Sequence, residues 1–219
     1  EYDIGERCDF EVYDNIDLDS ITDTGVPYII RNNTMTLNLM SIAPLFYTDT
    51  PVVVGDSVEL GKSGKTSRRM PLSAYIRNMH NHADISVFDP DVLKIMNFSI
   101  PVSLNIPQSK KTLLVGGPNT GLKFHFHSAG WNLVLRGSKR WLMFPAESSN
   151  DNFARMSHRY ATPLDTQTWL RETPQYIQKK MYQCMQRTGD IVVVPHGWLH
   201  SVINTDATVA IVARFLSQS

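Results

Sequence analysis

The feature that most constrains the fold of this chain is a series of short apolar runs, each bounded by turn-forming residues. β-Branched and aromatic residues predominate in these runs, as is typical of strands. The runs are Val26–Arg31, Pro51–Val54, Lys111–Val115, Leu133–Arg136, Lys139–Phe144, Ile191–Val194 and Val209–Leu216. Many short strands of this kind predict an all-β sandwich or jelly roll.

Helical signals are fewer, and the strongest lies in the first half of the chain, where we expect most of the helices. Apolar residues in Pro71–His80 recur at i, i+3, i+4 and i+7, and proline is allowed in a first helical turn. The weaker candidates are Ser41–Tyr47, Phe153–Arg155, Thr166–Leu170 and Gln175–Met185, the last as a helix that runs into a strand. The sequence therefore predicts a β core with a few helices.

One connection between strands carries a specific turn signal. Gly137-Ser138 separates two strand-like runs, and glycine in the first position of a two-residue loop is typical of a type II′ hairpin. The turn predicts that the flanking runs pair directly, with Asn132 opposite Met143. In that register Asn132 and Lys139 lie on one face, roughly 13 Å apart along the strand direction.

The composition excludes several classes of protein. Hydrophobic residues make up 42% and charged residues 19% of the chain, which is a globular composition. With 21 basic and 21 acidic residues, the net charge offers no electrostatic argument for nucleic-acid binding. No apolar run reaches the roughly 18 residues of a membrane span. Two cysteines are too few for zinc-finger arrays or a disulfide-dense scaffold.

Three of the seven histidines are candidate metal ligands. In a strand, His125 and His127 point to the same side and Phe126 points to the opposite side, into apolar packing. The alternative is a pair of polar residues on an exposed edge strand. His200 follows a buried apolar run, a Pro/Gly turn and Trp198, which would hold its ring rigidly. Three neutral imidazoles suit a first-row divalent metal, and we expect these three to converge on one ion.

The segments that carry these histidines resemble the Jumonji-C (JmjC) family of cupin-type oxygenases. Leu122–Glu147 is similar to the family block with His-x-Asp, an Asn, Gly-x-Lys-Arg-Trp and Phe-Pro. Gly189–Phe215 is similar to the block with the distal metal histidine. Weaker likeness at Pro27–Asn32 and Gly55–Leu60 extends the resemblance over most of the chain. It is strongest to the luminal subgroup of Jumonji-domain-containing protein 8, which also has His-x-His.

The resemblance implies a fold and an activity. The fold is a double-stranded β-helix, the jelly roll of cupins, in one domain over residues 1–219. Residues 1–110 supply N-terminal strands and helices, and residues 111–219 form the metal-binding core. The implied activity is that of an Fe(II)- and 2-oxoglutarate-dependent hydroxylase that acts on a protein side chain. Its partner is a protein or peptide rather than a nucleic acid.

The resemblance also assigns site residues and leaves alternatives open. His125 and His200 take the first and distal ligand positions, Lys139 matches the lysine that binds the far carboxylate of 2-oxoglutarate, and Asn132 matches an asparagine that contacts this cosubstrate in some members. His127 departs from the family, whose active members have Asp or Glu there. The alternatives are a catalytically inactive interaction protein with a degenerate metal site, and a three-His dioxygenase that needs no 2-oxoglutarate. Divalent metals other than iron are compatible with three histidines.

Cellular location follows from weaker signals. The luminal subgroup has cysteines near Cys8 and Cys184, so the resemblance implies a disulfide between them; two buried free thiols are the alternative. Two N-glycosylation triplets begin at Asn32 and Asn97. Together these features favour the secretory pathway or the lumen of the endoplasmic reticulum.

Overall fold

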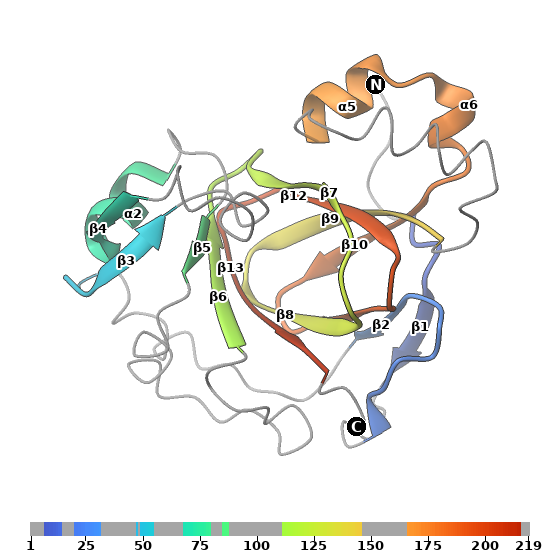
Figure 1. The fold of residues 1–219 in the computed structure, drawn as a ribbon, viewed down its shortest axis with the longest axis horizontal. Helices are drawn as coiled ribbons and strands as arrows, with labels where there is room; N and C mark the ends of the chain where they lie inside the picture. Colours follow the sequence, from blue (N-terminus) through green and yellow to red (C-terminus); the bar gives the residue numbers. More distant parts are fainter. Residues whose placement is uncertain are drawn as a thin grey trace.

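Two β-sheets face each other around a common interior and form the body of the protein in the computed structural model (Figure 1). The structure describes residues 7–14, 20–31, 47, 49–54, 68–79, 85–87, 111–145 and 166–215. The expected Ser41–Tyr47 and Phe153–Arg155 helices and the Asn32 and Asn97 triplets lie wholly or mainly outside these residues. Within them, no helix is long and apolar enough to cross a membrane.

The predicted jelly roll is confirmed by the strand order. The larger sheet contains, in spatial order, β1 (Glu11–Asp14), β2 (Tyr28–Arg31), β11 (Ile191–Val194), β8 (Gly130–Arg136), β13 (Thr208–Arg214), β6 (Lys111–Gly116) and β5 (Ile85–Val87). The smaller sheet contains β10 (Tyr182–Arg187), β9 (Ser138–Phe144), β12 (Leu199–Asn204) and β7 (Gly121–His125). A separate pair joins β3 (Pro51–Val54) and β4 (Arg68–Pro71). Neighbours in each sheet are mostly distant in sequence.

The helices cover the outer faces of the sheets. α2 (Leu72–Asn78), predicted from its apolar spacing, buries Leu72 and Tyr75 against the larger sheet, and the Tyr75 hydroxyl donates to the Val115 carbonyl at 3.1 Å. α5 (Thr166–Glu172) and α6 (Gln175–Gln178) are the helices of the two weaker C-terminal candidates. They lie over the smaller sheet (Figure 1), where Trp169 packs on outward-facing residues.

Side chains alternate between the interior and the outer cores. On β9, Trp141 and Met143 face the interior, whereas Leu142 and Phe144 pack outward against α5 and α6. On β8, Trp131 and the other odd-numbered side chains face outward toward α2. Both faces of these strands are therefore buried, and the polar side chains of the interior are enclosed.

The predicted hairpin at Gly137 is wrong. β8 pairs with β11 and β13, while β9 pairs with β10 and β12, so the two strands belong to opposite sheets. Gly137, with φ of 86°, is the corner where the chain passes from one sheet to the other. A turn signal reports only local backbone geometry. Here each of the two strands is hydrogen-bonded along both edges to other strands, so they do not pair with each other. Asn132 and Lys139 still share the interior, but they enter it from opposite sheets.

We expect Gly137→Ala to lower the free energy of unfolding by about 2–4 kcal/mol. Alanine is strained at this positive φ, and its Cβ atom would also clash with a neighbouring carbonyl oxygen. A Cβ atom at this corner would lie 2.3 Å from the carbonyl oxygen of Ala207. Gly189→Ala is the matched control: its φ is 88° but no atom lies within 4 Å of its Cβ position. Urea denaturation measures both, and equal losses would contradict the close contact at Gly137.

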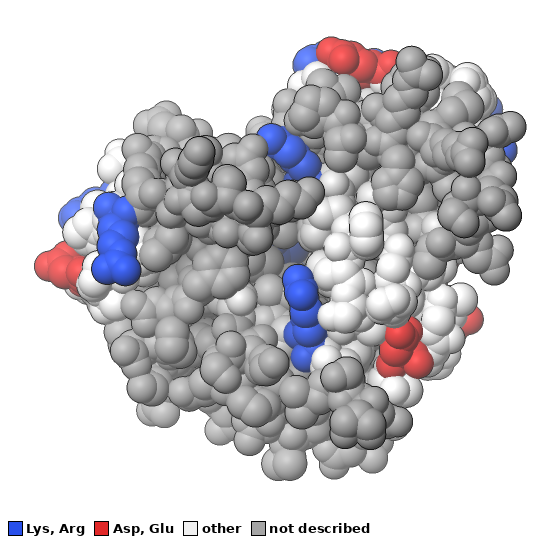
Figure 2. Space-filling model, in the orientation of Figure 1, with Lys and Arg blue, Asp and Glu red and all other residues white. Residues whose placement is uncertain are grey.

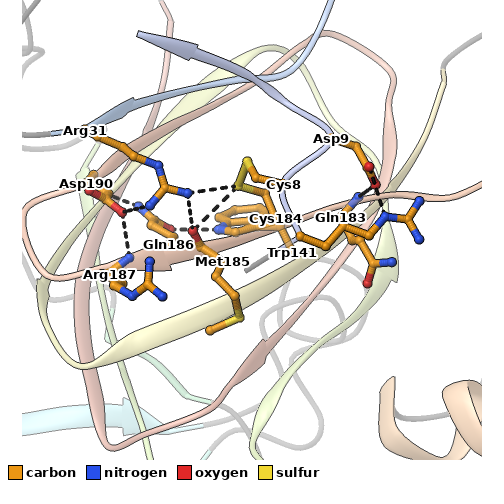
Figure 3. Close-up of a disulfide and its surroundings, with 11 residues drawn as sticks. Cys8, Asp9, Arg31, Trp141, Gln183, Cys184, Met185, Gln186, Arg187 and Asp190 are labelled. Atoms are coloured by element: carbon orange, nitrogen blue, oxygen red, sulfur yellow. Dashed lines mark hydrogen bonds and ion pairs between the residues drawn. A yellow bond between two sulfur atoms is a disulfide. The ribbon is translucent and has the colours of Figure 1, made fainter. Parts of the chain in front are cut away.

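A disulfide joins the edges of the two sheets, which confirms the Cys8–Cys184 pairing (Figure 3). Cys8 lies three residues before β1, the edge strand of the larger sheet, and Cys184 lies in β10 at the edge of the smaller sheet. The Cα atoms are 4.0 Å apart, slightly closer than the usual range for disulfides. Asp9 reinforces the link, because its backbone N–H donates to the Gln183 carbonyl at 2.8 Å and its carboxylate accepts from the Gln183 N–H.

Candidate metal centre

Three imidazoles meet at one end of the barrel interior. His125 ends β7 and His200 lies in the adjacent strand β12, where the two are register partners. His127 follows two residues after the end of β7. One nitrogen from each of the three rings lies within 4.8 Å of the other two. This convergence is the one expected from the sequence, and a single ion can be bound by all three rings.

The hydrogen bonds of the three rings select the tautomer that a metal needs. Each Nδ1 atom contacts a backbone carbonyl oxygen: Lys123 at 2.7 Å for His125, Ser128 at 2.6 Å for His127 and Trp198 at 2.8 Å for His200. A carbonyl oxygen only accepts, so each Nδ1 carries the hydrogen and donates it. Each Nε2 atom keeps its lone pair. Histidine ligands in proteins are oriented by such bonds.

Burial keeps two of these rings neutral. It lowers the pKa of His127 to about 4, against the opposing effect of the bond to the Ser128 carbonyl. It also lowers the pKa of His200 well below its ordinary value, and the neighbouring His125 and His127 add to this shift. Neutral imidazole is the form that coordinates metals.

The position of Phe126 corrects one expectation. The sequence predicts that this side chain packs into an apolar environment, but it is 62% exposed. The reason is that β7 ends at His125, so strand alternation no longer applies beyond it. His127 is held instead by the Pro195–Trp198 turn, where the Gly197 N–H donates to its carbonyl oxygen at 3.0 Å.

A buried glutamine that sequence reasoning missed supports the wall of this site. The Trp141 ring lies 6.0 Å from the His200 ring, and its indole N–H donates to the Gln186 side-chain oxygen at 2.7 Å. The Gln186 amide nitrogen donates to the carbonyl oxygens of Asn132 and Asp190. Gln186 is fully buried, and its hydrogen bonds connect β10 of the smaller sheet to β8 of the larger sheet. Its place on the inward face of β10 was the only sequence signal available.

Lys139 and Asn132 are enclosed in the same interior. Both are almost fully buried, and the Lys139 ammonium donates to the side-chain oxygen of Asn204 at 3.0 Å. Lys139 and Asn204 are register partners, four residues along β12 from His200, which is roughly 13 Å along the strand. The Asn132 side-chain oxygen has no hydrogen-bond partner among the described residues. A buried polar atom of this kind requires a partner, such as a bound molecule or water.

The surface around the barrel opening is basic where it can be described. Figure 2 shows a hollow near the middle of this face, with Lys or Arg side chains beside it and the visible Asp and Glu side chains farther away. Arg214, the last residue of β13, is exposed and contributes to the lowered pKa of His127 and His200. Among the described residues, the positive side chains beside the hollow favour an anionic ligand over a cationic one.

The family follows from a sequence match that covers this whole site. Residues 112–215 match the family model described as "JmjC domain, hydroxylase". Residues 112–215 are a JmjC domain. The match runs from β6 to the residue after β13 and includes the three histidines, Asn132 and Lys139. The resemblance seen in the sequence is therefore confirmed.

Several curated proteins are similar to this JmjC domain. Human JmjC domain-containing protein 8 is 30% identical over 99 residues, which is 44% of this chain and 34% of that protein. Arginine-specific demethylase JMJ22 of Arabidopsis thaliana is 28% identical over 116 residues, or 49% of this chain and 23% of that protein. The bifunctional arginine demethylase and lysyl-hydroxylase psr-1 of Caenorhabditis elegans is 28% identical over 115 residues, 48% and 29% of the two chains. The matches span about a third or less of these relatives.

The site residues fit the groups that the JmjC family uses, which are Fe(II) and 2-oxoglutarate. Three Nε2 lone pairs suit a divalent transition metal. A buried ammonium and the Asn132 oxygen, which has no partner among the described residues, provide polar groups deeper in the interior. The departure is charge: the usual oxygenase site has two histidines and a carboxylate, whereas His127 supplies no negative charge here.

Proposed function

We propose that this protein is an Fe(II)- and 2-oxoglutarate-dependent dioxygenase that hydroxylates a protein side chain. The observation that supports this most directly is the convergence of His125, His127 and His200, each donating from Nδ1 to a backbone carbonyl. The JmjC match and its hydroxylase and demethylase relatives favour oxygenase chemistry.

The histidines would hold the metal, and iron bound there would supply the activation of O₂. The chain itself contributes orientation and exclusion of water. The carbonyl oxygens of Lys123, Ser128 and Trp198 fix the ring tautomers. The Trp141 ring packs beside His200 and closes the interior on that side. Such a preformed, enclosed site lowers the reorganisation that the reaction requires.

Lys139 would bind the distal carboxylate of 2-oxoglutarate, and Asn132 would contact the same molecule. An ammonium has three N–H donors, so the bond to Asn204 is compatible with a bond to a carboxylate. Burial strengthens this attraction, because the interior screens charge less than water does. The same lysine argues against a three-His dioxygenase that works without 2-oxoglutarate.

A second candidate is a JmjC-fold interaction protein without catalytic activity. The observation that favours it is His127, which stands where active members of the family have Asp or Glu. Three neutral ligands leave both positive charges of the ion uncompensated, which weakens binding relative to a site with a carboxylate. Measured binding of metal and 2-oxoglutarate distinguishes the two candidates.

We expect Lys139→Ala to weaken 2-oxoglutarate binding by about 10- to 100-fold, the usual value of a hydrogen bond to a charged group. Calorimetry on protein loaded with Mn(II) measures this affinity, and the affinity for Mn(II) itself should not change. Lys179→Ala, at an exposed lysine, is the matched control. If the wild type does not bind 2-oxoglutarate at millimolar concentration, the interaction-protein candidate replaces the hydroxylase.

We also propose that the protein matures in an oxidising compartment, the secretory pathway or the lumen of the endoplasmic reticulum. The Cys8–Cys184 disulfide supports this, since structural disulfides persist where the redox environment is oxidising. Glycosylation at Asn32 and Asn97 stays a prediction. Peptide mapping under non-reducing conditions tests the location, and two free thiols in protein isolated from its native cells would refute it.

A further inference from the structure

We propose that Arg214 binds a carboxylate of the protein substrate, so that the hydroxylated side chain has an Asp or Glu close to it. This inference rests on the proposed function and names a substrate class for it. Arg214 is the last residue of β13 and is exposed. No hydrogen bond or ion pair joins its guanidinium to another described residue.

Strand alternation places Arg214 on the inner face of the larger sheet. Ile211 and Ala213 pack in the core outside this sheet, whereas Val212 lies on the inner face, opposite Asn132 on β8. Arg214 comes two positions after Val212, so it belongs to the same face. Its side chain therefore starts on the wall of the interior, at the end of the strand.

This end of β13 is also the end of the barrel that carries the metal centre. Arg214 is the register partner of Gly130, the first residue of β8, and the next residue, Phe215, donates its backbone N–H to the Ala129 carbonyl at 3.0 Å. Ala129 lies two residues after His127. The pKa of His127 is lowered mainly by burial, and the positive charge of Arg214 adds to this shift. The guanidinium is therefore close enough to act on a metal ligand.

The charges at this end of the barrel favour an acidic substrate over a basic one. The three imidazoles are neutral ligands, so they do not reduce the positive charge of a bound divalent ion. Arg214 adds a further positive charge close to the same ligands. Like charges repel the side chain of a Lys or Arg in the substrate, whereas a carboxylate can form two parallel hydrogen bonds with a guanidinium.

The depth of Arg214 points to the substrate rather than the cosubstrate as the source of this carboxylate. Lys139, the residue proposed for 2-oxoglutarate, is 5% exposed and lies deep in the interior, whereas Arg214 is exposed. An apolar ring is exposed near the same ligands: Phe126 connects His125 and His127 and is 62% exposed. A peptide can contact both a guanidinium and an aromatic ring, and a small anion cannot.

The test selects peptides from a randomised library of short peptides that contains Glu, Gln and Lys in equal amounts. Protein loaded with Mn(II) and 2-oxoglutarate binds the library under anaerobic conditions, and mass spectrometry identifies the retained peptides. We expect the wild type to prefer Glu over Gln by about 3- to 10-fold, less at high salt because exposed charges are screened. Arg214→Gln should abolish this preference, Arg214→Glu should reverse it in favour of Lys, and Arg214→Lys should retain part of it.

Arg136→Gln is the matched control, because Arg136 is exposed and lies at the opposite end of β8 from Gly130. It should select peptides as the wild type does. An equal preference for Glu in Arg214→Gln and in the wild type would overturn the inference, as would an equal loss in Arg136→Gln.

Calorimetry with 2-oxoglutarate separates this inference from the proposed function. Arg214→Gln should bind 2-oxoglutarate as the wild type does, and a loss of 10-fold or so would mean that Arg214 binds the cosubstrate instead, which would overturn the inference. If the wild type binds 2-oxoglutarate but shows no preference for Glu, only the inference fails. If the wild type does not bind 2-oxoglutarate, the proposed function and the inference fail together.

Discussion

Replacing His200 with alanine is expected to abolish binding of the divalent metal, with a loss of affinity of at least about 100-fold. Substitution of a residue that only orients a metal ligand lowers metal affinity by about 10- to 100-fold, so removal of the ligand itself should lower it at least as much. His200 is the most buried of the three histidines, and its ring centre lies 4.3 and 4.7 Å from those of His125 and His127. Titration with Mn(II) under anaerobic conditions measures the loss.

Two further variants make this prediction specific. His200→Leu retains more of the buried volume but offers no ligand atom, so it should lose the metal equally, which separates ligation from packing. His196→Ala replaces an exposed histidine in the adjacent turn, whose described contact is through its backbone N–H to Asp23. It should bind the metal as the wild type does. Retention of wild-type affinity in both His200 variants would refute the metal centre.

Loss of the disulfide is expected to have the largest effect on stability. Cys184→Ser should lower the free energy of unfolding by about 2–5 kcal/mol, and a protein of this size loses about 2–4 °C in Tm for each kcal/mol. The bond spans 176 positions and joins the edge regions of both sheets. Cys184 is also buried among Trp141, Trp198 and other residues of the interior core. Thermal unfolding followed by circular dichroism measures the change.

The partner cysteine provides the control. Cys8→Ser and the double variant should lose about as much as Cys184→Ser, because all three remove the same bond and the losses do not add. A reducing agent should destabilise the wild type but not the variants. If the double variant lost the sum of the two single losses, separate packing effects rather than the cross-link would explain the result.

Strands with strong β-propensity were predictable from the chain alone. β9 and β11 are apolar runs between turn residues, and each lies close to its expected bounds. β1 was missed because its four residues are all exposed at the edge of a sheet and show no alternation of burial. β4 was missed because its Arg68–Arg69 portion gives no apolar strand signal.

The metal ligands could be predicted from the sequence, whereas the buried polar residues Gln186 and Asn204 could not. His125, His127 and His200 lie in segments whose residue types and spacing already point to metal binding, and the family resemblance reinforces this. Gln186 and Asn204 are ordinary polar residues within strands, and their roles depend on partners on other strands. Sequence patterns report the side to which a residue points, but they do not report which distant residue it meets there.

Local chemistry in the sequence determined the strands, the helix α2 and the identities of the three histidines, because propensity and spacing act over a few residues. The tertiary structure decided which strands pair, and it placed β8 and β9 in opposite sheets despite the turn signal at Gly137. It also exposed Phe126 and set Asn204 beside Lys139. These outcomes depend on burying both faces of each strand at once, and that requirement involves residues far apart in the chain.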